Sequence, residues 1–229
     1  MKISIIIPTL NEATNIQRLL AYINDAPGQD LLAEVLIIDA GSTDDTIAIG
    51  KSVGAQALLC PDKGRACQMN YGASIAKGDV LHFIHADVLP PKTFLLDIYE
   101  NLSDEHQYGC FSYKFDKSSP GLRFNEMMIR FDWVAVGGGD QTLFIKKDFF
   151  YEIGGFKEKL PIMEDFDFVW RAKRKAEMCY VKKDAIVSAR KFEENSYVKV
   201  QLANIFVFFL FRLGVSPHFL AKFYRGVLK

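Results

Sequence analysis

The sequence predicts an α/β domain in which a mostly parallel sheet carries helices on both faces. Runs that are apolar throughout recur along the N-terminal half, and stretches with a helical spacing of apolar residues separate them. Strands of a parallel sheet are buried on both faces, so they form continuous apolar runs rather than an alternating pattern. The 229 residues include 49% hydrophobic and 24% charged residues, which suits one folded domain and excludes a disordered chain.

Alternating strands and helices account for the first part of the chain. The expected strands are Ile3–Ile7, Val35–Ile38, Ala55–Cys60 and Val80–Ile84. The first helix follows Asn11, which we interpret as its N-cap. The second helix begins near Ser42, and the third covers Arg65–Ala76. Within the fourth strand, we interpret His82 as a core histidine whose polar atoms are satisfied.

The pattern becomes looser after Pro90. The further expected helices are Phe94–Leu102, Leu122–Val136 and Glu164–Lys175, and the further expected strands are Tyr108–Phe115 and Gln141–Ile145. From Tyr197 onward the chain is expected to be helical, with a break between Gly214 and Pro217.

The last 35 residues differ from the rest, and we divide the chain into a catalytic domain, 1–194, and a helical extension, 195–229. The extension contains six Phe, no Asp or Glu, and five cations: Lys199, Arg212, Lys222, Arg225 and Lys229. Because the whole chain is neutral, residues 1–194 carry a net charge of −5. Three interpretations stay open: a helix packed on the domain, a homodimer contact, or a peripheral membrane contact with cations toward the head groups.

Polar residues collect where the four expected N-terminal strands end. The segments are Pro8–Glu12, Asp39–Asp44, Pro61–Arg65 and His85–Asp87. In open α/β sheets, ligands bind outside the carboxyl ends of the strands. Asp39 and Asp87 at equivalent strand ends therefore indicate a site, and the Lys, Gly and Arg before the third helix suit a phosphate.

Several common functional classes are excluded by missing patterns. The sequence has no G-x-G-x-x-G after the first strand, no G-x-x-x-x-G-K-[ST] and no G-x-S-x-G. A phosphate would then be held by cations and a metal. Equal numbers of acidic and basic residues, 28 each, argue against a nucleic-acid partner.

The order and spacing of these motifs resemble family 2 glycosyltransferases with the GT-A fold. The matching segments are Ile5–Glu12, Ile38–Thr46, Gly64–Asn70, Gly78–Asp79, His85–Asp87, Gly139–Gln141, Gly154–Phe156 and Glu164–Asp165. The Arg-x-x-Gln-Met-Asn run and the His-Ala-Asp triplet are most similar to a small bacterial subgroup. In this triplet, His85 replaces the first acid of the family's D-x-D motif.

The resemblance implies a role for each matching position. The residues implied to bind the nucleotide sugar are Pro8, Thr9, Glu12, Asp39, Gly64, Arg65, His85 and Ala86. Asp87 is the implied ligand of a divalent metal, Mn²⁺ or Mg²⁺, and Asp165 is the implied catalytic base, with Glu164 beside it. The residues implied to contact the acceptor or the donor sugar are Gly139, Asp140 and Gln141.

The expected activity is an inverting, metal-dependent glycosyltransferase, a hexosyltransferase that moves a sugar from a UDP- or GDP-linked donor to an acceptor hydroxyl. Two alternatives stay open: a nucleotide-sugar-binding module without turnover, and a nucleotidyltransferase. The acceptor is not identified, and a lipid-linked molecule is one candidate. Four cysteines without a C-x-x-C pair and a first apolar run that ends at Pro8 suggest a cytoplasmic protein, at the inner face of the membrane if the extension binds lipid.

Overall fold

An eight-stranded sheet runs through the residues that the computed structural model describes, 1–129 and 142–228. The strand order is β3-β2-β1-β4-β7-β6-β8-β5. The strands are β1 (Ile3–Thr9), β2 (Leu32–Asp39), β3 (Gln56–Leu59), β4 (Val80–Phe83), β5 (Val88–Leu89), β6 (Tyr108–Phe115), β7 (Phe144–Lys146) and β8 (Met178–Val187).

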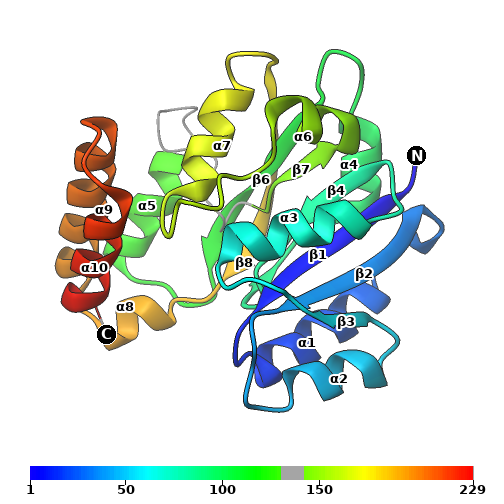
Figure 1. The fold of residues 1–229 in the computed structure, drawn as a ribbon, viewed down its shortest axis with the longest axis horizontal. Helices are drawn as coiled ribbons and strands as arrows, with labels where there is room; N and C mark the ends of the chain where they lie inside the picture. Colours follow the sequence, from blue (N-terminus) through cyan, green and yellow to red (C-terminus); the bar gives the residue numbers. More distant parts are fainter. Residues whose placement is uncertain (130–141, 229) are drawn as a thin grey trace.

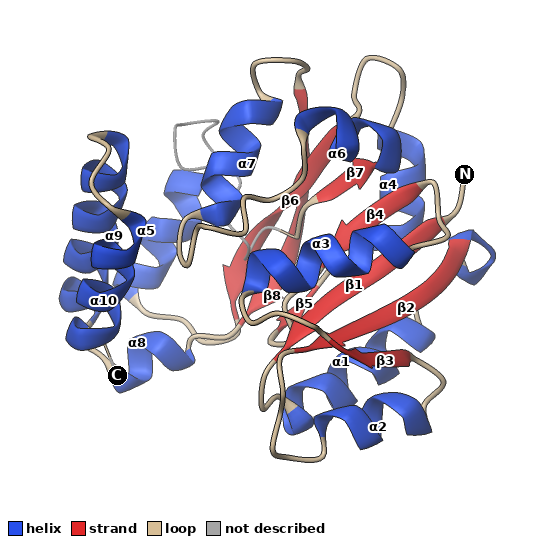
Figure 2. Cartoon of the chain, in the orientation of Figure 1, coloured by secondary structure: helices blue, strands red, loops and turns tan. Residues whose placement is uncertain are grey.

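Helices cover both faces of this sheet (Figures 1 and 2). They are α1 (Ala13–Asn24), α2 (Thr46–Ser52), α3 (Arg65–Ile75), α4 (Phe94–Asn101), α5 (Pro120–Ile129), α6 (Lys147–Ile153), α7 (Glu164–Ala172), α8 (Arg190–Glu194), α9 (Tyr197–Arg212) and α10 (Pro217–Val227). A short 3₁₀ helix, Gln29–Leu31, precedes β2. The predicted α/β class is confirmed.

The N-terminal half of the sheet is parallel, as predicted. β1 pairs in parallel with β2 and β4, and β2 with β3. Parallel register brings Thr9 opposite Asp39, so the ends of β1 and β2 lie at one edge. The other half is mixed, because β7 runs antiparallel to both β4 and β6, while β6 and β8 are parallel.

The side chains of β1 separate two cores. Ile5 and Ile7 belong to the core under α1 and α4, whereas Ile6 points into the core under α3, α6 and α7. Successive side chains of a strand alternate between faces, so a continuous apolar strand can serve both layers. This burial on both faces is the physical reason that most residues of β1 are apolar.

Several predicted boundaries are wrong in detail. Asn11 is not the N-cap of α1, because Glu12 occupies that position and Asn11 has a left-handed φ of 56°. The second helix begins at Thr46 rather than near Ser42, and β7 begins at Phe144 rather than Gln141. Before α2, Ser42 accepts from the amide of Asn11 and Asp44 accepts from the amide of Ala13, so these polar residues bond to the segment after β1 instead of extending the helix.

Four elements had no counterpart in the sequence prediction: β5, β8, α6 and α8. β8 mixes buried and exposed positions and includes two adjacent lysines, so it lacks a clear apolar run. The predicted helix Leu122–Val136 is observed as α5, and its continuation, with Gly137–Gly139, lies outside the described residues.

The C-terminal extension forms a helical hairpin that packs on α7. The Phe166 and Trp170 rings of α7 each lie 5.6 Å from the Phe208 ring of α9. Val207 and Leu220 are buried in the same small cluster. The hairpin lies at the end of the molecule opposite β2 and β3 (Figure 1). Packing on the domain is therefore observed, whereas the domain boundary and the dimer and membrane interpretations stay predictions.

His82 is a core histidine, as predicted, but its polar atoms are not satisfied. The side chain is fully buried, and neither ring nitrogen has a hydrogen-bond partner among the described residues. The Phe94 ring lies 5.3 Å away, and Phe111 and Phe144 also face it. Burial lowers the pKa of His82 from 6.5 to about 3, so the ring is neutral in the folded state.

We predict that acid destabilises the fold partly through this residue. Below about pH 6.5 the unfolded chain binds a proton that folded His82 excludes, so stability falls by about 1.4 kcal/mol per pH unit toward pH 3. A His82→Leu variant should show a shallower decline in the free energy of unfolding, measured in urea between pH 7 and pH 4. Identical slopes for the variant and the wild type would contradict the assignment.

Candidate functional site

The carboxyl ends of the parallel strands are joined by backbone hydrogen bonds that continue the sheet into its loops. The amide of Ala40 donates to the carbonyl of Thr9 at 3.0 Å, and the amide of Cys60 donates to the carbonyl of Asp39 at 2.7 Å. Gln68 of α3 is buried, and its amide donates to the carbonyls of Thr9 at 2.8 Å and Ile38 at 2.7 Å. These contacts hold the first two strand ends in one fixed arrangement.

Asp39 is the acceptor at the centre of this arrangement. Its Oδ1 accepts from the amides of Gly41 and Ser42, and its Oδ2 accepts from the hydroxyls of Thr9 and Ser42. The side chain is fully buried, which a carboxylate tolerates when several donors surround it. Asp39 therefore shapes the loop after β2, and its expected contact with a nucleotide base stays a prediction.

A second set of polar contacts joins the loops after β1 and β2. The amide of Asn11 donates to Ser42 at 2.7 Å, and the Asn11 side chain accepts from the amide of Thr43 at 2.8 Å. The amide of Glu12 donates to the Thr46 hydroxyl at 2.9 Å, leaving the partly exposed Glu12 carboxylate bonded to Asn15. Pro8 is also partly exposed at this edge, so both residues can be reached by a ligand.

The turn before α3 carries an arginine that reaches the far half of the sheet. Gly64 has a φ of 128°, a conformation that side chains other than glycine rarely adopt, and Arg65 is the first residue of α3. The Nε of Arg65 lies 2.7 Å from the Oε1 of Glu164. Arg65 is half-exposed, whereas Glu164 is 2% exposed. This ion pair brings two sequence-predicted site residues together across 99 positions of the chain.

Glu164 and Asp165 begin α7 but have different surroundings. Met163 before them has a left-handed φ of 69°, which turns the chain sharply into the helix. Glu164 is buried against Arg65, whereas Asp165 is partly exposed. The first turn of a helix favours acidic residues through its free N–H groups and dipole, and Asp167 lies in the same turn.

Unusual backbone conformations gather around the same region. Among the described residues, three non-glycine residues have a positive φ: Asn11, Thr142 and Met163. Each belongs to a loop next to a predicted site motif, and such strained residues concentrate at functional sites. The predicted residues Gly139, Asp140 and Gln141 immediately precede Thr142 and lie outside the described residues.

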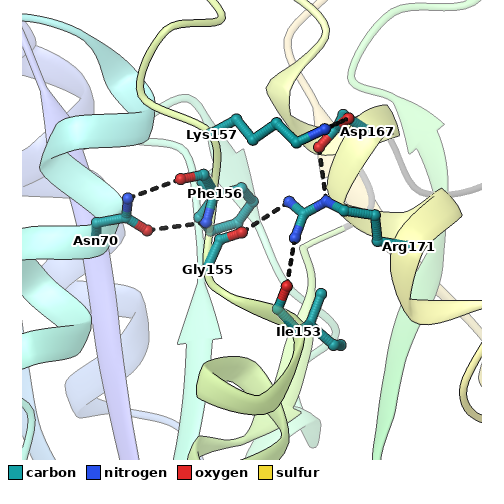
Figure 3. Close-up of polar contacts among 7 residues, drawn as sticks. All are labelled: Asn70, Ile153, Gly155, Phe156, Lys157, Asp167 and Arg171. Atoms are coloured by element: carbon teal, nitrogen blue, oxygen red, sulfur yellow. Dashed lines mark hydrogen bonds and ion pairs between the residues drawn. The ribbon is translucent and has the colours of Figure 1, made fainter.

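The segment between α6 and α7 is held by two polar side chains (Figure 3). Asn70 of α3 accepts from the amide of Phe156 and donates to its carbonyl, both at 2.9 Å. Arg171 of α7 donates to the carbonyls of Ile153 and Gly155, both at 2.7 Å. The sequence motif contained Asn70, but no sequence signal indicated the role of Arg171.

Asp167 completes this network and fixes the orientation of Arg171. Its carboxylate accepts from Arg171 at 2.8 Å and from Lys157 at 2.7 Å (Figure 3). The network therefore links the Gly154–Phe156 motif to the helix that begins with the Glu-Asp pair.

The His-Ala-Asp triplet directly follows β4. Ala86 is buried, whereas His85 and Asp87 are partly exposed. Desolvation of the imidazole, with a smaller contribution from the charge of Arg65, lowers the pKa of His85 from 6.5 to about 3. His85 is therefore neutral near pH 7, and one ring nitrogen can accept a hydrogen bond or bind a metal.

Sequence comparison identifies the family to which this chain belongs. A sequence model described as Glycosyl transferase family 2 matches residues 4–170, which is well over half of the chain. The chain therefore belongs to glycosyl transferase family 2. The match begins in β1 and ends in α7, so it includes both sides of the Arg65–Glu164 ion pair.

Individual relatives are similar over shorter regions. An uncharacterized glycosyltransferase of Rickettsia felis is 31% identical over 116 residues, which cover 51% of this chain and 36% of the relative. Glucosyl-3-phosphoglycerate synthase of Mycobacterium tuberculosis is 35% identical over 99 residues, covering 39% of this chain and 30% of the relative. The matched part thus spans about a third of the length of these curated relatives.

Solved structures share the fold. TarS of S. aureus (residues 1–349) superimposes with a TM-score of 0.68 at 18% identity, covering 87% of this chain and 64% of that chain. The mannosyltransferase PcManGT of Pyrobaculum calidifontis, solved with GDP-Man and Mn²⁺, also has a TM-score of 0.68, at 19% identity, covering 90% and 62%. The predicted GT-A fold is confirmed.

We predict that Arg171 stabilises the segment before α7. An Arg171→Lys variant keeps the charge but carries its donors on one nitrogen, which cannot occupy the three positions that Nε, Nη1 and Nη2 of Arg171 occupy, so it should lose about 1–3 kcal/mol of unfolding free energy. Lys175→Ala is the matched control, because Lys175 makes an exposed ion pair with Glu152 worth about 0–1 kcal/mol. Equal losses in urea titrations of the two variants would contradict the prediction.

Proposed function

We propose that this protein is an inverting, metal-dependent glycosyltransferase that moves a sugar from a UDP- or GDP-linked donor to an acceptor hydroxyl. The main support for the proposal is the Arg65–Glu164 ion pair. It joins the turn before α3, which is suited to bind phosphate, to the carboxylates at the start of α7. Membership of family 2 supports the activity, and the solved relatives with UDP-GlcNAc and GDP-Man support the class of donor.

The proposed donor site lies along the strand ends. Pro8, Thr9 and Glu12 border the nucleotide, and Asp39 holds the loop against which its base rests. Gly64 and Arg65 face the diphosphate, since a guanidinium at a helix N-terminus is well suited to phosphate oxygens. In this proposal His85 and Ala86 contact the ribose, and the segment Gly139–Gln141 contacts a sugar.

The residues after β4 fit a metal ion that is bound partly by the protein and partly by the phosphates of the substrate. No group of three or more His, Cys, Asp or Glu able to hold a metal occurs among the described residues. Mg²⁺ typically binds one or two carboxylates together with substrate phosphates, so a closed protein site is not required. Asp87 would supply the carboxylate, and neutral His85 lies two residues before it. When bound, the metal would neutralise charge on the departing nucleoside diphosphate.

Asp165 is the proposed catalytic base. The acceptor oxygen forms a bond to the anomeric carbon on the side opposite the diphosphate, while the bond from that carbon to the phosphate oxygen breaks. The hydroxyl proton passes to the Asp165 carboxylate, and the electron pair leaves with the nucleoside diphosphate. Partial exposure of Asp165 permits contact with an acceptor, whereas buried Glu164 holds Arg65 in place.

We predict that Asp87→Ala abolishes the metal-dependent part of nucleotide binding. The change removes the proposed carboxylate ligand from a partly exposed position, so the fold should persist. Calorimetry with UDP or GDP, with and without Mn²⁺, measures the effect. Asp148→Ala, an exposed acid on α6, is the control and should bind as the wild type does. Unchanged affinity in Asp87→Ala would remove this residue from the metal site.

We predict that Asp165→Asn lowers kcat by about 10²-fold or more while donor binding persists, because the amide keeps the shape but cannot accept the proton. Glu164→Gln is the contrasting variant: it breaks the ion pair with Arg65 and should weaken donor binding and stability. Steady-state kinetics and donor titrations separate the two effects. A near-wild-type kcat in Asp165→Asn would assign the base elsewhere, and donor binding without turnover in the wild type would favour a binding module.

A further inference from the structure

The C-terminal hairpin exposes an apolar stripe on its outer side. Val198, Leu202, Ile205 and Phe209 of α9, together with Leu213 at its C-cap, are 61–64% exposed. They follow one another at spacings of three or four residues, which places them along one side of the helix. A continuous exposed stripe of this kind marks an interaction surface rather than isolated surface residues.

The opposite side of α9 is already occupied, so the orientation of the helix is fixed. Val200, Ala203 and Val207 are buried. Phe208 and Phe211 contact the Trp170 ring of α7 at 5.6 and 5.9 Å. The stripe therefore lies on the side of α9 that does not contact the domain. Packing of the other side on α7 keeps the stripe facing solvent.

α10 extends the apolar surface beside the stripe. The Phe206 ring of α9 and the Phe223 ring of α10 lie 4.8 Å apart, and both line a shallow groove between the helices. The lining of that groove is almost wholly apolar, with Lys199 at its margin. Phe219, further along α10, is 56% exposed.

The charged side chains of α9 and α10 are all positive. Lys199 on α9 and Lys222 and Arg225 on α10 are exposed, whereas the guanidinium of Arg212, at the end of α9, lies over the Trp170 ring at 4.7 Å. Residues 195–229 contain no Asp or Glu. An apolar stripe on a hairpin whose charged side chains are all cations is complementary to a surface that offers acyl chains beneath anionic groups.

We propose that the α9–α10 hairpin docks on an anionic lipid bilayer. α9 has 16 residues and is about 24 Å long, and no helix of the described part of the chain is long and apolar enough to cross a membrane. The hairpin would therefore lie in the plane of the interface, with the stripe facing the acyl chains and the cations facing the head groups. A symmetric dimer through this face is less favourable, because it would bring the same cations against one another.

The test is co-sedimentation of the full chain with vesicles made of equal parts of phosphatidylglycerol and phosphatidylcholine. The protein is expected to bind these vesicles, to bind vesicles of phosphatidylcholine alone at least tenfold more weakly, and to lose affinity as the salt concentration rises. The double variant Leu202→Glu, Phe209→Glu should not sediment with either vesicle. Both positions are exposed, so the variant should keep the wild-type Tm.

A matched control separates the stripe from general exposed apolar surface. Leu59 is 62% exposed on β3, at the other end of the molecule, and Leu59→Glu should bind vesicles as the wild type does (Figure 1). Analytical ultracentrifugation of the wild type and the double variant tests the alternative that a second copy of the chain covers the stripe. Failure of the wild type to sediment, equal binding by the double variant, or a dimer that the double variant dissociates would each overturn the proposal. These experiments measure lipid binding and oligomeric state, not turnover. Their outcome is therefore independent of whether the protein has the proposed transferase activity.

Discussion

The buried carboxylate of Glu164 connects the two halves of the molecule. An ionised carboxylate without a partner is costly inside a protein, so Glu164 must keep Arg65 within reach. Arg65 begins the helix that covers the parallel half of the sheet, whereas Glu164 begins a helix that covers the mixed half. This contact joins the start of α7, and with it Asp165, to the start of α3, while Phe168 packs the same helix against Phe150 and Phe156.

The rest of the site follows the same physical pattern, in which loops are held by polar atoms. Asp39 accepts four hydrogen bonds, one from Thr9 at the end of β1 and three from the loop after β2, and Gln68 joins the ends of these two strands to α3. Asn70 and Arg171 similarly hold the segment that precedes α7. These hydrogen bonds are made within the protein, so the loops that they join are fixed before any ligand arrives.

The hairpin adds a second surface on the far side of α7. Its inner side completes the domain by covering Phe166 and Trp170, and its outer side presents the apolar stripe and its cations. α7 thus carries the proposed catalytic carboxylate, Asp165, in its first turn and packs against the hairpin through Phe166 and Trp170. The two features stand on different observations, since one rests on charged groups at strand ends and the other on exposed apolar side chains.

Local patterns in the sequence determined the parallel half of the fold and the positions of its motifs. Continuous apolar runs predicted β1 to β4 within a few residues, because burial of most of their side chains leaves an apolar mark in the strand itself, although Leu59 of the edge strand β3 is exposed. The loop motifs also predicted which residues would meet at the sheet edge, since parallel strands end on one side. Short or half-exposed elements such as β5 and β8 left no such mark, because their pairing is set by distant neighbours. Only the tertiary structure decided that Glu164 is buried against Arg65 while Asp165 beside it is partly exposed, and which side of α9 faces solvent. These outcomes depend on contacts between segments far apart in the chain, and such contacts are not written in the spacing of neighbouring residues.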